Sequence, residues 1–182
     1  MHPPTLFVIS GTQGAGKSTV AQVLARRFER GAWVSADALH KMIVAGGRWP
    51  EGVEMSPDAE LQLALRLKHA CWLGRSFVAA GITAIVDDII IGDRLDALLY
   101  ELAGTRFVFV MLRPRLEVVQ QREAGRGTAL WQQWAWLDDV IGQQTQRLGL
   151  WLDTSDLTVD ETVDAIMARA WAEGIVEAPP RP

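Results

Sequence analysis

The chain has 182 residues, a length typical of one domain with a sizeable core. It contains no apolar run near the roughly 18 residues of a membrane span, and its opening run Leu6–Ile9 is too short for a signal peptide. The formal net charge of −4 argues against a nucleic-acid partner, and the single cysteine, Cys71, excludes an internal disulfide and favours a cytoplasmic location.

Short apolar runs alternate with longer helical patterns, which is typical of a parallel sheet covered by helices. Because the central runs lack polar alternation, we expect strands that are buried on both faces. The predicted strands are Leu6–Ser10, Ala32–Ser35, Ile82–Val86, Thr105–Leu112 and Leu148–Leu152. The predicted helices span residues 17–30, 38–45, 57–80, 94–103, 115–124, 129–147 and 159–171. These elements predict one three-layer αβα domain over residues 1–177 with a five-stranded parallel sheet, followed by a disordered tail at 178–182.

The segment from Gly11 to Ser18 matches the phosphate-loop pattern G-x-x-x-x-G-K-[ST] in full. It follows an apolar strand and opens an amphipathic helix, which is the context that the motif requires. Glycines let the backbone N–H groups curl around phosphates, and the following helix points its positive end at the anion. We expect Lys17 to reach the β and γ phosphates and the Ser18 hydroxyl to ligate Mg²⁺. The residues assigned to nucleotide binding are Gly11, Thr12, Gln13, Gly14, Ala15, Gly16, Lys17, Ser18 and Thr19.

Asp37 follows the second predicted strand and precedes a helix. A carboxylate at this position could accept the proton of an attacking hydroxyl, which is a general-base role. It could also be the N-cap of the helix, and one residue could serve both purposes.

Asp87 and Asp88 come directly after the third predicted strand. They therefore lie at the carboxyl edge of the sheet, where open α/β folds bind their ligands. A phosphate loop needs a carboxylate for its metal, so we expect one of the two to serve Mg²⁺, directly or through water. The sequence does not decide which of them does so, and the other could face the acceptor or cap the next turn.

Arg122 and Arg126 follow the fourth strand and are four residues apart, so on a continuing helix they share one face. Two guanidiniums closing over the γ-phosphate would stabilise the charge of the transfer and exclude water. Gly125 and Gly127 would supply the flexibility of a lid at about residues 122–130. The alternative is a solvated basic helix end.

With these motifs in this order, the chain resembles the small P-loop kinases, and most of all the chloramphenicol phosphotransferase-like and zeta-toxin-like groups. The segment Ala79–Asp88 is similar to the one before the acidic pair in chloramphenicol phosphotransferases, and Leu152–Ser155 resembles the turn near the adenine. The resemblance implies a P-loop NTPase fold, ATP with Mg²⁺ as cofactors, and Asp37 as the general base.

The leading interpretation is a kinase that moves the γ-phosphoryl group of ATP to a hydroxyl of a small molecule, such as an antibiotic, sugar, nucleoside or nucleotide sugar. The first alternative is an acceptor-independent ATPase or nucleotide-binding switch, and the second is a zeta-toxin-like kinase with an antitoxin partner. A GTPase of the usual kind is excluded, because its Asn-Lys-x-Asp motif cannot occur in a chain without asparagine.

Overall fold

The computed structural model describes residues 2–50, 55–124 and 136–181. The strands are β1 (Leu6–Gly11), β2 (Gly31–Ser35), β3 (Thr83–Asp87), β4 (Arg106–Leu112), β5 (Leu150–Leu152) and β6 (Ile175–Glu177). The described helices are α1 (Lys17–Arg26), α2 (Ala36–His40), α3 (Pro57–Ala79), α4 (Arg94–Glu101), α5 (Leu116–Ala124), α7 (Trp136–Gln143) and α8 (Val159–Glu173). Among them, none is long and apolar enough to cross a membrane.

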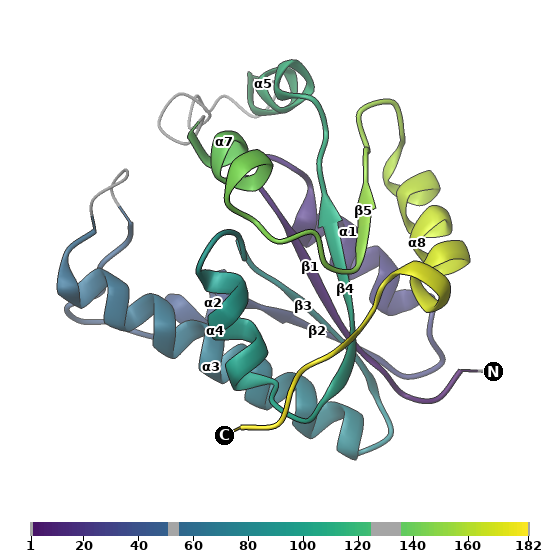
Figure 1. Ribbon diagram of the computed structural model, residues 1–182, viewed down its shortest axis with the longest axis horizontal. Helices are drawn as coiled ribbons and strands as arrows, with labels where there is room; N and C mark the ends of the chain where they lie inside the picture. The colour runs from purple at the N-terminus through teal and green to yellow at the C-terminus, as the bar shows by residue number, and fades with distance from the viewer. Residues whose placement is uncertain (1, 51–54, 125–135, 182) are drawn as a thin grey trace.

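The five strands expected from the sequence form one parallel sheet in the order β2-β3-β1-β4-β5 (Figure 1). This confirms the predicted α/β class with a parallel sheet. Strand β6 was not predicted, because a three-residue run shows no measurable periodicity. It pairs antiparallel with the first half of β4, while β5 pairs with the second half.

Helices cover both faces of the sheet and give the three layers. On one face, α1 and α8 pack through a buried cluster that includes Leu24 and Ile166. On the other face, α3, α4 and α7 pack through a second cluster that includes Leu67, Leu98 and Ile141. The central strands β1, β3 and β4 contribute apolar side chains to both clusters, as expected for strands buried on both sides.

Three helices end at least four residues before the ends predicted from the sequence. Helix α1 ends at Arg26, where the chain turns back tightly toward β2. The turn brings Gly31 so close to the helix that a Cβ there would lie 1.9 Å from the carbonyl oxygen of Ala25. Helix α2 ends at His40 and leads into the irregular segment before α3. The helix predicted over residues 129–147 ends at Gln143, and its first residues lie outside the described part of the chain.

Ala178, the first residue of the predicted tail, is buried, and its N–H donates to the Thr105 carbonyl. Its own carbonyl accepts from the Gly104 N–H. This order follows from β6, which carries the chain past the start of β4 and so places Ala178 against the turn before that strand. The domain boundary at residue 177 stays a prediction.

The thiol of Cys71 lies in the cluster beneath α3, where it is 2% exposed. Burial raises its pKa from 9.0 to about 12, with a smaller contribution from the charges of Glu101 and Asp88. At neutral pH the folded protein should therefore hold about 10³-fold less thiolate than the unfolded chain. We expect a disulfide reagent to label the native protein that much more slowly than the chain in concentrated guanidinium, as followed by absorbance. Equal rates would contradict the burial of this thiol.

Candidate functional site

The phosphate loop lies between β1 and α1, at the carboxyl edge of the sheet. Gly11 has a positive φ of 146° and is packed so closely that a Cβ there would lie 2.5 Å from the Leu112 carbonyl oxygen. Gly16 precedes the helix in the left-handed region, with φ 92°. Both positions therefore need glycine, and the chain reaches Lys17 as the first residue of α1. This is the strand–loop–helix arrangement that an anion site at a helix N-terminus requires.

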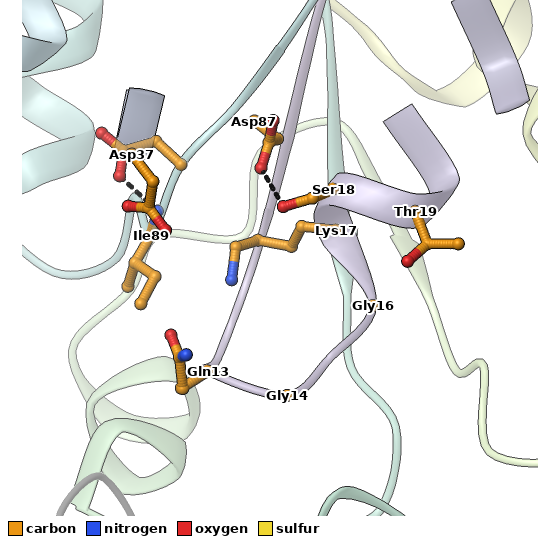
Figure 2. A pocket seen from close by; sticks show the side chains of 10 residues that line it. Gln13, Gly14, Gly16, Lys17, Ser18, Thr19, Asp37, Asp87 and Ile89 are labelled. Atoms are coloured by element: carbon orange, nitrogen blue, oxygen red, sulfur yellow. Dashed lines mark hydrogen bonds between the residues drawn. The ribbon is translucent and has the colours of Figure 1, made fainter. Parts of the chain in front are cut away.

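Lys17 lies between this loop and a group of carboxylates (Figure 2). Its Nζ donates to the Thr12 carbonyl over 2.8 Å. Desolvation by its dense surroundings lowers the pKa of the ammonium, while the charges of Asp87, Asp88 and Asp37 oppose that shift. The lysine therefore carries its charge close to the phosphate loop, where it is placed to bind phosphate oxygens.

Asp87, the last residue of β3, is held on both of its oxygens. The Ser18 hydroxyl donates to Oδ2 over 2.6 Å (Figure 2). The indole N–H of Trp33, on the neighbouring strand β2, donates to Oδ1 over 2.6 Å. Burial raises the pKa of Asp87, and the two hydrogen bonds and the charge of Lys17 oppose that rise. We expect the Ser18 hydroxyl to ligate the metal, and of the two adjacent aspartates only Asp87 is bonded to this hydroxyl.

Asp88 faces a different environment, although it is the next residue. Its side chain is 1% exposed and accepts from Arg66 on α3 through Oδ1 and from Arg94 on α4 through Oδ2, the latter over 3.1 Å. The Ile89 N–H also donates to Oδ1, over 2.7 Å. With two arginines and a backbone amide as donors, the Asp88 carboxylate is committed to joining α3 and α4 to the end of β3.

Asp37 occupies the first turn of α2, but it is not the N-cap. Ser35 caps the helix, since its hydroxyl accepts from the Ala38 N–H over 3.3 Å, so the N-cap interpretation of Asp37 is wrong. The side chain of Asp37 is 60% exposed and accepts from Nη1 of Arg66 over 3.1 Å. This leaves the carboxylate oriented by one ion pair and open to the cavity.

These side chains meet in one cavity (Figure 2). Its lining joins the phosphate loop to all three predicted carboxylates, and consists of Gln13, Gly14, Gly16, Lys17, Ser18, Thr19, Asp37, Asp87, Asp88 and Ile89. Among the described residues, no cluster of three or more His, Cys, Asp or Glu side chains could hold a metal by itself. A hydroxyl and one carboxylate beside a phosphate loop suit Mg²⁺ instead, because this ion usually completes its shell with water and substrate phosphates.

A second cavity of about 310 Å³ lies on the other side of the phosphate loop. It is lined by Ala15, Gly16, Thr19, Val20, Arg122, Thr154, Leu157, Thr158, Val159 and Thr162. Arg122 donates to the Thr154 carbonyl over 2.9 Å and so lies at this cavity. Thr154 itself is 2% exposed, and its buried hydroxyl oxygen has no partner among the described residues. Arg126 and most of the predicted lid at residues 122–130 lie outside the described residues.

Three residues that hydrogen-bond to the aspartates of the site were not predicted. Arg66 could have been noticed, because it interrupts the apolar stripe of α3 between Leu63 and Ala70, and a charged side chain on a buried stripe needs a partner. Trp33 and Arg94 carry no comparable signal. Their roles depend on how β2 and α4 pack beside β3, which no local pattern reveals.

Arg66 should also matter for stability, because it compensates the buried charge of Asp88. Replacing it with leucine leaves that carboxylate with one cationic partner, and breaking a buried pair in this way costs about 3–5 kcal/mol. We expect a loss of this size in the free energy of unfolding, measured with denaturant. Arg115→Leu is the matched control, since Arg115 pairs with Asp156 at the exposed surface and should contribute little. Equal losses in the two variants would contradict the network.

Comparison with known proteins agrees with this geometry. The model of the family described as chloramphenicol phosphotransferase-like protein matches residues 5–171. No protein among curated sequences matches the chain. The solved structures that resemble it include a sugar kinase from a Janibacter species, with 20% identity, coverage of 91% of this chain and 94% of that one, and a TM-score of 0.65.

Two further structures have the same TM-score of 0.65. The APS kinase of Mycobacterium tuberculosis in complex with AMPPNP and APS has 18% identity, with 92% of this chain and 98% of that chain covered. The tunicamycin resistance protein of Deinococcus radiodurans has 19% identity, with coverage of 97% and 99%. At these identities the structural likeness concerns the fold, whereas the family match concerns the sequence over most of the chain.

Proposed function

The chain belongs to the chloramphenicol phosphotransferase-like family, and from this membership we propose that it transfers the γ-phosphoryl group of ATP to a hydroxyl of a small molecule. One observation carries the proposal beyond membership. A single cavity contains both the phosphate-loop lysine, Lys17, and a largely exposed carboxylate, Asp37, at its far side. Phosphoryl transfer needs this pairing of a phosphate-binding group with an acceptor for the hydroxyl proton.

In the proposed reaction the acceptor hydroxyl oxygen forms a bond to the γ-phosphorus while the bond from that phosphorus to the ADP oxygen breaks. The hydroxyl proton passes to Asp37, which Arg66 holds in place. Lys17 and the N-terminus of α1 stabilise the charge on the phosphate oxygens. Phosphoryl transfer is mainly a matter of positioning and charge, and these groups contribute to both.

For Mg²⁺, which would neutralise charge on the phosphates, we assign Ser18 and Asp87 as the residues that hold it. Asp88 was an equal candidate on sequence, but its two arginine partners argue for a structural role. The cavity beside Thr154 lies on the opposite side of the phosphate loop from Asp37 and suits the base of ATP. Arg122 lines it, and we retain Arg122 and Arg126 as the arginines of a lid over the phosphates.

The acceptor is best sought by mass spectrometry. We would incubate the protein with ATP, Mg²⁺ and mixtures of antibiotics, sugars, nucleosides and nucleotide sugars, and look for a product that gains the mass of one phosphoryl group. The Lys17→Ala protein is the control for contaminating kinases. A matched release of ADP should accompany each product. ADP release that no acceptor stimulates would instead support the ATPase alternative, and growth arrest on expression would support the toxin.

The remaining assignments concern the extent of the domain, the partners and the location of the protein. We propose a single domain over residues 1–177 with a small-molecule partner and no nucleic-acid partner, in view of the net charge of −4. The lone buried cysteine favours a cytoplasmic location.

A further inference from the structure

Trp33 is an aromatic residue at the open edge of the sheet whose position the proposed transfer does not by itself explain. It lies on β2, which pairs only with β3 among the described strands. Its side chain is 40% exposed, which is unusual for a large apolar ring without a role. The ring lines a surface groove together with residues of α1 and the turn after it, including Gln22, Arg26 and Phe28.

The polar end of this ring points inward. Nε1 donates to Oδ1 of Asp87 over 2.6 Å, which is short for a bond from a neutral N–H group. The register of β2 and β3 explains how the Trp33 indole can bond to Asp87. Trp33 pairs with Ile85 and Ser35 pairs with Asp87, so the indole stands two residues before the carboxylate on the same face of the sheet. The indole N–H therefore extends along the strand direction to the side chain at the end of β3.

Two hydrogen bonds fix the orientation of the Asp87 carboxylate. Ser18 donates to its Oδ2 and Trp33 to its Oδ1, so the plane of the carboxylate is set by one donor on each oxygen. A side chain that is 5% exposed and bonded in this way cannot rotate without losing one of the two bonds. Donors that hold a metal-binding carboxylate in a single orientation commonly contribute 10–100-fold to metal affinity.

We propose that Trp33 is a positioning residue for the metal site: its indole N–H holds the Asp87 carboxylate in the orientation that binds Mg²⁺ with the nucleotide. Trp33 does not line the cavity that contains the phosphate loop, and in this proposal it acts through its hydrogen bond to Asp87. The inference rests on the proposed function insofar as that function assigns Mg²⁺ to Ser18 and Asp87. It does not depend on the acceptor.

The test compares Trp33→Phe with Trp72→Phe by calorimetric titration with AMPPNP, in Mg²⁺ and in EDTA. Phenylalanine keeps an aromatic ring at the strand edge and removes the donor. Trp72 is the matched control, since it is 67% exposed on α3 and does not line the cavity. We expect Trp33→Phe to weaken binding in Mg²⁺ by about 10-fold and to leave binding in EDTA unchanged. Trp72→Phe should change neither.

A purely structural role for Trp33 would weaken binding equally in Mg²⁺ and EDTA, and that result overturns the proposal, as does unchanged binding in both. The double variant with Asp87→Asn adds a second criterion. If Trp33 acts through Asp87, Trp33→Phe should cost nothing further once the carboxylate is gone, and an additive loss would contradict the inference.

Failure of the proposed function is distinguishable from failure of this inference. A wild-type protein that binds AMPPNP more tightly in Mg²⁺, yet phosphorylates no acceptor, would contradict the kinase assignment, and the Trp33→Phe comparison would still decide the role of the indole. A wild-type protein whose AMPPNP binding is indifferent to Mg²⁺ would overturn both the metal assignment and the role of Trp33.

Discussion

Replacing Lys17 with alanine should reduce kcat/KM by at least about 10²–10³-fold, because it removes the cation that the phosphate loop presents to the transferred group. Lys17 is the first residue of α1 and lies beside three carboxylates. Without it, nucleotide phosphates would meet the nearby charge of Asp87 with one cation fewer. Affinity for AMPPNP should therefore fall together with turnover.

Lys68→Ala is the matched control for this variant. Lys68 is exposed on α3 and does not line the cavity, so the same substitution there should leave nucleotide binding and turnover at wild-type values. Calorimetric titration and steady-state kinetics measure the two quantities. A Lys17→Ala protein with normal affinity and turnover would show that the loop does not hold the phosphates.

The second large effect concerns Asp37. Its conversion to asparagine keeps the shape of the side chain and removes the proton acceptor, so we expect kcat to fall by at least about 10²-fold. Binding of AMPPNP with Mg²⁺ should change little, because Asp37 lies across the cavity from the phosphate loop. A loss confined to kcat would separate a base from a binding residue.

Asp58→Asn provides a strict comparison for Asp37→Asn. Both aspartates are the second residue of a helix, and both helices begin after a serine cap, so the two substitutions remove the same favourable charge from a first turn. Only Asp37 faces the cavity. If the two variants retain similar turnover with the acceptor found by the screen, Asp37 is not the base.

Local patterns predicted much of this molecule correctly, and the reason is that they act over short distances. The phosphate loop is one continuous segment, and its first glycine is required by close contacts within the loop and with the end of β4. The parallel strands are apolar runs without alternation, since they are buried on both faces. The position of Asp37, Asp87 and Asp88 at one edge follows from the common direction of parallel strands.

The different roles of Asp87 and Asp88 could not be predicted from local patterns. Successive side chains at a strand end turn to different sides, and their roles depend on what each meets. Asp87 meets Ser18 and Trp33, while Asp88 meets arginines from α3 and α4. These contacts join residues 22 to 69 positions apart, except for Arg94, and they depend on how whole helices pack against the sheet.

Arg66, Arg94 and Asp88 form a largely buried network of ion pairs, and only the Asp37 end of it is exposed. Dissolved ions screen exposed charges over about 10 Å at 0.1 M, but they have little access to buried partners. The junction of α3, α4 and the end of β3 should therefore tolerate changes in ionic strength that weaken a surface pair such as Arg115–Asp156. A protein built in this way can keep the geometry of this wall of its cavity while the salt content of its surroundings varies.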